Sequence, residues 1–200
     1  MSPRALAALV PAALALVAAG CGSSSPASSS SASSSGTPNR KAAEVNPAGD
    51  IPDTQVYVRY RPSGATYSVK VPEGWSRTAT AVATRFTDKL NSIVMAAHAA
   101  ASAPTVASVR SHELQPIAAS AKAYKPGTVT RVSRTSGTAV LAKYETAGVP
   151  NPVTGKTKPA EVERYSFFHK GREVVLTLSG PKGADNVDPW RIVTDSLRWR

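Results

Sequence analysis

The stretch Val162-Glu-Arg-Tyr-Ser-Phe-Phe-His169, followed by Lys170-Gly171 and then, after one arginine, by Glu173-Val-Val-Leu-Thr-Leu-Ser179, decides the fold class. Both runs are rich in aromatic and β-branched residues, which favour strands over helices. Gly171 can adopt the positive φ that a tight turn requires. The stretch therefore predicts a hairpin of two strands, Val162 to His169 and Glu173 to Ser179.

Further strand patterns precede this hairpin. We expect strands over 129–134 and 139–145, and two earlier hairpins, one over 56–60 with 67–71 and one over 82–86 with 93–95. Pro72 ends the second of these strands, because proline has no N–H to give to a ladder. Residues 149–159 contain three prolines and Gly155 and are expected to form a loop.

Two helices are expected beside these strands. The alanine-rich run 113–123 predicts one, with Pro116 near its start. Asp188-Pro189 predicts the start of the other, with Asp188 as the capping residue. Trp190, Val193 and Leu197 then share one apolar face of that helix. Successive hairpins without a strand–helix–strand rhythm predict an α+β fold, an antiparallel β-sheet covered by helices in an α/β sandwich.

The N-terminal quarter is built differently. A short cationic head and an apolar run end in small residues before Cys21, the only cysteine of the chain. We interpret residues 1–20 as a lipoprotein signal peptide and Cys21 as the lipidated residue. Residues 21–53 are expected to form a disordered Ser/Pro-rich tether, and 54–200 a single α+β domain. A diacyl anchor at Cys21 would hold the chain at the extracytoplasmic face of the cell membrane.

These residues also carry a resemblance to a known family. The strand that ends in Pro72-Glu73-Gly74-Trp75, the middle helix, the long two-stranded ribbon and the closing Ser196-Leu197-Arg198-Trp199 resemble the PsbP-like fold family. Within that family the chain is similar to lipid-anchored actinobacterial lipoproteins of the LpqN type. The resemblance covers residues 54–200. It implies accessory and protein-binding roles, with no catalytic motif and no cofactor.

Motifs that imitate catalytic sequences lack the required context. Ser179-Gly180-Pro181-Lys182 has the Ser-x-x-Lys spelling, but Gly-Pro inside it prevents the helical turn that this chemistry needs. Gly155-Lys156-Thr157 resembles the end of a phosphate-binding loop, yet proline stands where its first glycine belongs. The histidines at 98, 112 and 169 are too scattered for a local zinc motif. We therefore expect a protein that is not an enzyme, with no bound cofactor or metal.

One turn leaves two readings open. Asp185, Asn186 and Asp188 could offer oxygen ligands to Ca²⁺, although their spacing is not that of an EF-hand loop. The same residues could simply form a turn and a helix cap.

The charge of the chain indicates the class of partner. Lys and Arg number 24 against 13 Asp and Glu, a formal net charge of +11. An exported chain would meet anionic lipid or wall polymer rather than nucleic acid. Our expectation is an envelope protein partner, with a small-ligand or metal-binding accessory of a transporter as the alternative. A candidate interaction surface consists of the basic residues in or beside strands, namely Arg131, Arg134, Lys143, Lys170 and Arg172.

Overall fold

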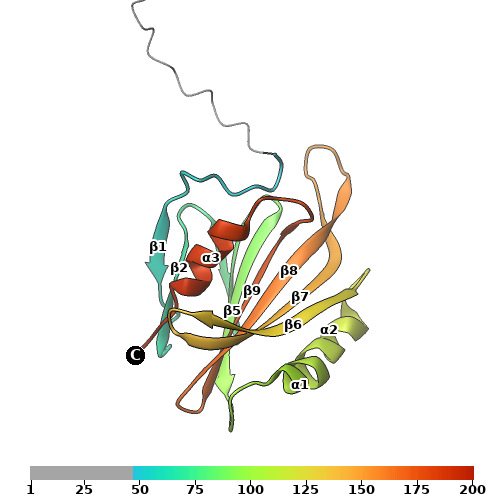
Figure 1. Ribbon diagram of the computed structural model, residues 1–200. Coiled ribbons are helices and arrows are strands. Elements are labelled where there is room, and N and C mark those ends of the chain that lie inside the picture. The colour runs from blue at the N-terminus through green and yellow to red at the C-terminus, as the bar shows by residue number, and fades with distance from the viewer. Residues whose placement is uncertain (1–46) are drawn as a thin grey trace, which may run out of the picture. The chain divides into compact units, whose positions relative to one another are not determined.

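Two antiparallel sheets and their covering helices make up the structure, a computed structural model that describes residues 47–200 (Figure 1). The small sheet has the order β1-β2-β10, and the large sheet has the order β3-β4-β5-β9-β8-β7-β6. The strands are β1 (Tyr57–Tyr60), β2 (Tyr67–Pro72), β3 (Ser76–Ala79), β4 (Ala83–Asp88), β5 (Asn91–Ala99), β6 (Lys125–Arg134), β7 (Gly137–Pro150), β8 (Thr157–His169), β9 (Arg172–Pro181) and β10 (Arg198–Trp199). The helical segments are α1 (Val106–Ser108), the π-helix η1 (Val109–Leu114), α2 (Gln115–Ser120) and α3 (Val187–Asp195). The predicted α+β fold is confirmed.

The hairpin of β8 and β9 lies at the centre of the large sheet. Tyr165 pairs with Leu176 and Phe167 with Val174 across β8 and β9. Gly171 closes the turn at φ 75°, as its position predicted. Because β9 also pairs with β5 and β8 with β7, this hairpin joins the two halves of the sheet.

One face of the large sheet packs against the small sheet and α3. Tyr165, Phe167 and Leu176 are almost fully buried there, together with Val69 of β2. Trp190 and Val193 of α3 belong to the same cluster, as predicted. Leu197 also belongs to it but lies beyond the end of α3 at Asp195, so the predicted helix was too long. Figure 1 shows α3 lying across this face of the sheet.

The opposite face packs under the helical segment α1–η1–α2. Val109 and Leu114 are buried against β6, β7 and β8, and Val106 and Ile117 extend the contact. Val109 and Leu114 are five residues apart, a spacing that an α-helix would place on different sides. The π-turn of η1 brings them to one side, because its hydrogen bonds join residues five apart.

The predicted middle helix has the wrong bounds. The helical segment runs over 106–120 rather than 113–123, because Thr105 and Ser108 form a capping box that fixes an earlier start. Pro116 does stand in the first turn of α2. The helix ends at Ser120, and Ala123 has a φ of 53°, which no helix accommodates.

The loop predicted over 149–159 is also shorter than expected. Strands β7 and β8 continue to Pro150 and from Thr157, so that only six residues separate them. Beyond the pair Ala160–Pro181 the ribbon has two strands only, and there a proline such as Pro159 breaks no ladder bond on its outer side. Strand β3 was not predicted, since its four residues are all exposed and show no apolar alternation.

A buried amide network ties the N-terminal segment to the sheet and to α3. The Asn186 side chain accepts from the Ile51 amide at 2.9 Å and donates to the Gly49 carbonyl at 3.0 Å and to Asn91 Oδ1 at 3.1 Å. Asn91 Nδ2 donates to the same Gly49 carbonyl at 2.8 Å. Ile51 is buried in the main core, so contacts with the domain begin before residue 54, where we expected the tether to end.

The cap assignment at α3 is therefore wrong. Asn186 is the residue before the helix, and its side chain makes no capping bond because the amide network uses it. Asp188 lies inside the first turn and is exposed. Pro189, which the sequence predicted as the first residue of the helix, is its third residue, after Val187 and Asp188.

Several expectations fall on residues outside the described part of the chain. The signal peptide 1–20, Cys21 and the tether up to residue 46 belong to this group. Within 47–200, none of the helices has the length and apolar character needed to cross a membrane.

The amide network predicts that Asn186 contributes more to stability than Asp188 does. Asn186→Ala should lower the free energy of unfolding by about 3 kcal/mol, because it leaves the buried Ile51 amide without an acceptor. Asp188→Ala should lower it by less than about 1 kcal/mol, since only a favourable charge near the helix start is lost. Urea unfolding of the two variants measures both values. Equal losses would contradict the assignment of Asn186 as the structural residue.

Candidate functional site

A groove of about 580 Å³ opens between the small sheet and the edge of the large sheet. Its walls are the β1–β2 turn and the β3–β4 turn, and its floor includes Tyr67 of β2 and Met95 of β5. Three arginines line it, Arg61, Arg77 and Arg172. We call this the arginine groove.

Topology brings the three arginines together. Arg61 begins the turn that follows β1, and Arg77 lies on the edge strand β3 opposite Phe86. Arg172 is the first residue of β9, next to the end of β5 through its pairing with Ala99. The β1–β2, β3–β4 and β8–β9 turns all lie near this opening, so residues more than 90 positions apart in the sequence line the same groove.

The charge of the arginine groove is unopposed. None of its lining residues is aspartate or glutamate. Within residues 47–200, none of the three guanidinium groups forms an ion pair or a side-chain hydrogen bond. Arg77 lies over the Tyr60 ring at 5.5 Å, a cation–π contact that holds it at the wall.

Two tyrosines, Tyr60 and Tyr67, also line the groove. Burial, and secondarily the nearby Tyr60, raise the pKa of Tyr67 to about 12. Its hydroxyl therefore stays protonated and can donate a hydrogen bond at physiological pH. Tyr60 is fixed from behind by an edge-to-face contact with Phe86, with ring centroids 5.0 Å apart. The arrangement suits an anionic ligand.

The lining offers no histidine, cysteine or carboxylate for general-base catalysis. It contains hydroxyls of Ser63, Thr80 and Thr84 but no histidine, cysteine or carboxylate that could accept their protons. The groove can bind and orient a ligand, and its lining provides no general base.

The structure does not bring the five predicted basic residues together. Arg172 lines the groove, and Lys170 lies in the adjoining β8–β9 turn. Arg134 bonds to Thr194 and Tyr165 and pairs with Asp195 at 3.8 Å. Lys143 pairs with Glu163. Arg131 precedes Val132, which packs against the main core, so Arg131 faces the other side of the sheet.

The turn at Asp185, Asn186 and Asp188 is a structural feature. Both polar atoms of the Asn186 amide are used within the fold, and its side chain is buried. Among residues 47–200, no three histidine, cysteine or acidic side chains converge as a metal-binding group.

The imitation motifs are likewise structural. Ser179 lies in β9, where its hydroxyl is 2.8 Å from that of Ser92, and no helical turn brings Lys182 to it. His169 stacks on Trp199 with ring centroids 5.2 Å apart. His112 is exposed on η1.

A second cluster of charged groups lies beneath the helical segment. Glu113 of η1 accepts from Arg164 at 2.8 Å and from the Ser166 hydroxyl at 3.0 Å. Glu173 lies nearby, 3.5 Å from His98 Nε2, and one of its carboxylate oxygens is buried without a hydrogen-bond partner in the described chain. Burial, and then the Glu113 carboxylate, raise the pKa of Glu173, while His98 opposes the shift.

Comparisons with known proteins identify the fold. No protein-family model matches the chain, and no curated protein matches it. Cyanobacterial PsbP (CyanoP) from Synechocystis sp. PCC 6803 is similar with a TM-score of 0.51 at 12% identity, over 82% of this chain and 100% of that chain. The Ran-binding protein Mog1p of Saccharomyces cerevisiae gives a TM-score of 0.48 at 11% identity, over 73% and 96%.

A protein from Bacteroides thetaiotaomicron gives a TM-score of 0.48 at 13% identity over 71% of this chain. The present chain spans about half of that protein, 48% of its length. The similarity to cyanobacterial PsbP shows that residues of the described domain adopt a PsbP-like fold. At 12% identity this similarity defines the architecture only, so function has to be argued from the groove itself.

Sequence analysis missed two of the three groove arginines. Arg172 was among the predicted surface residues, but Arg61 and Arg77 were not. No sequence spacing links these positions, because the strand order of the large sheet and the packing of the β1–β2 turn place them at one groove. A strand pattern at β3 would have been the one usable signal, and its exposed residues do not provide it.

The raised pKa of Glu173 predicts a pH dependence. A native carboxyl with a raised pKa binds its proton more tightly than the unfolded chain does, so stability falls as pH rises through that range. Glu173→Gln removes the buried charge and should therefore be more stable than wild type at pH 7, with the difference vanishing near pH 4. Melting temperatures from pH 4 to 7.5 measure this, with the exposed Glu73→Gln as control. A Glu173→Gln variant that is less stable at every pH would contradict it.

Proposed function

We propose that this chain is a non-enzymatic cell-envelope lipoprotein, an accessory module at the outer face of the cytoplasmic membrane that binds an acidic segment of another envelope protein. The observation that carries the proposal is the arginine groove, with three arginines and no acidic residue in its lining. The predicted signal peptide of residues 1–20, directly before Cys21, supports the location.

Arginine suits the recognition of carboxylates. Its planar guanidinium donates two parallel hydrogen bonds to one carboxylate, and such charge-assisted bonds are stronger than neutral ones. The three arginines come from separate elements, the β1–β2 turn, β3 and β9, so they can contact successive carboxylates of one bound segment. The groove is also within the size range of about 300–1,000 Å³ that binding sites usually have.

Turns on both sides favour a chain segment as the occupant. The β1–β2 turn contributes residues from Tyr60 to Ala65, and the β3–β4 turn contributes residues from Ala79 to Thr84. A peptide could lie between these turns with its side chains toward the arginines. The absence of a general base from the lining supports binding without chemistry.

A defined acidic peptide tests the groove. We expect residues 21–200 carrying Cys21→Ser to bind a fluorescent octaglutamate peptide and not octaglutamine, as measured by fluorescence polarisation at fixed salt. The double variant Arg77→Glu/Arg172→Glu should weaken binding by at least about tenfold, because each substitution replaces attraction by repulsion.

The matched control has the same change in charge on the other face of the sheet. Arg85→Glu/Arg131→Glu alters two exposed arginines outside the groove. It should change the affinity by less than about threefold, because salt screens the charges at that distance from the peptide. Equal losses in the two double variants would show diffuse attraction by net charge and would overturn the groove assignment. Tight binding of octaglutamine would do the same.

The anchor is tested separately. Cys21→Ser removes the only thiol of the chain and should abolish incorporation of a clickable fatty acid in a bacterium that processes lipoproteins. A Ser25→Ala variant should incorporate the label as wild type does. Label that persists on the Cys21→Ser chain would refute lipidation at this residue, with no bearing on the groove.

A further inference from the structure

A small apolar pocket lies at the end of the β7–β8 ribbon, far along β9 from the arginine groove. Its apolar walls come from four segments: Ala48 before the first strand, Leu90 of the β4–β5 turn, Val149 and Ala160 of the ribbon, and Pro181 of β9. Its volume is about 120 Å³. We call it the hairpin-tip pocket.

Packing of the N-terminal segment forms one side of this pocket. Gly49 lies so close to Pro181 that an added Cβ would stand 2.4 Å from the proline ring, and this contact places Ala48 over the opening. Ala160 and Pro181 are cross-strand partners and are both buried. The pocket is therefore bounded by fixed parts of the fold.

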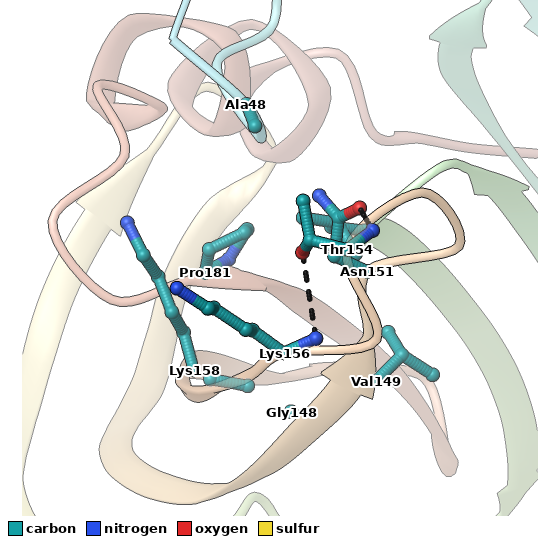
Figure 2. Close-up of a pocket in the computed structure, with 10 residues that line it drawn as sticks. Ala48, Gly148, Val149, Asn151, Thr154, Lys156, Lys158 and Pro181 are labelled. Atoms are coloured by element: carbon teal, nitrogen blue, oxygen red, sulfur yellow. Dashed lines mark hydrogen bonds between the residues drawn. The ribbon is translucent and has the colours of Figure 1, made fainter. Parts of the chain in front are cut away.

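Two lysines lie at the rim. Figure 2 shows the side chains of Lys156 and Lys158 with their ammonium ends on the same side of the pocket. No aspartate or glutamate lines the pocket, and neither lysine forms an ion pair within residues 47–200. An apolar interior with a cationic rim is complementary to a short alkyl chain with an anionic end.

The turn that carries the rim is ordered by Asn151. Its side-chain oxygen accepts from the backbone amides of Val153 and Thr154 at 2.9 and 3.0 Å. Its backbone N–H donates to the Lys156 carbonyl at 2.9 Å. Lys156 is thereby held at the point where the chain enters β8. The backbone that carries the two lysines is therefore fixed before a ligand binds.

We propose that the hairpin-tip pocket is a second binding site, which takes a short aliphatic carboxylate of about four to six carbons. The alkyl chain lies between Leu90, Val149 and Pro181, and the carboxylate contacts the ammonium groups of Lys156 and Lys158. The length follows from the volume, since an apolar cavity of about 150 Å³ holds one benzene molecule. This inference is independent of the function proposed for the arginine groove.

A homologous series of carboxylates measures the depth of the pocket. Acetate, butyrate, hexanoate and octanoate are titrated into ¹⁵N-labelled residues 21–200 carrying Cys21→Ser, and amide shifts of Leu90, Val149 and Ala160 are followed. Each buried methylene should raise the affinity about fourfold, the ratio that corresponds to about 0.8 kcal/mol, until the pocket is full. We expect the rise to stop between butyrate and octanoate.

A neutral ligand and charge variants test the rim. Hexanol should bind about threefold to tenfold more weakly than hexanoate, because exposed charge contacts are individually weak. Lys156→Gln/Lys158→Gln should remove that advantage and leave hexanol binding unchanged. The control Lys70→Gln/Lys170→Gln changes two exposed lysines outside the pocket and should leave both affinities as in wild type.

Ala160→Leu, which fills the pocket, should abolish binding of both ligands if the variant folds. The lysine variants keep the test decisive if it does not, because they change only exposed side chains. Shifts that do not saturate, shifts spread over the whole surface, or equal affinity for hexanoate and hexanol in the wild-type chain would each overturn the proposal.

Discussion

The buried amide network of Asn91 and Asn186 is the constraint that fixes the rest of the domain. It joins three segments that no backbone ladder connects: the N-terminal residues Gly49 and Ile51, the start of β5, and the residue before α3. Buried amides have few alternative hydrogen-bond partners, so the network fixes the positions of these three segments relative to one another. Even Gly180 is held to its residue type here, because a Cβ would stand 2.5 Å from Asn91 Oδ1 and 2.8 Å from Asn186 Nδ2.

The position of α3 that follows from this network produces the layers of the fold. With its start fixed beside β5 and β9, α3 covers the sheet with Trp190 and Val193, and the chain then returns as β10 to pair with β2. The small sheet is thereby held over one part of the large sheet. The arginine groove is the space that remains where the two sheets meet at the β1–β2 and β3–β4 turns.

The sequence could predict the fold wherever local pattern and tertiary environment agree. The β8–β9 hairpin shows this, since its apolar residues, its turn glycine and its burial all indicate the same structure. The middle helix shows the opposite case. Its true start depends on a Thr–Ser capping box, and its apolar face depends on a π-turn that no period of 3.6 residues predicts. The candidate site was less accessible still, because Arg61, Arg77 and Arg172 lie on separate turns and strands and line one groove only in the folded domain.

The direction of β9 has a mechanical consequence. Arg172 begins this strand at the arginine groove, and Pro181 ends it beside the N-terminal segment, about 30 Å away at the usual rise per residue. If the proposed anchor and a partner in the groove pulled on the domain, the tension would run parallel to β5 and β9. Antiparallel ladder bonds lie perpendicular to their strands, so such a load acts on all bonds of the ladder at once instead of opening them one by one. The domain is thus oriented to resist shear along β5 and β9.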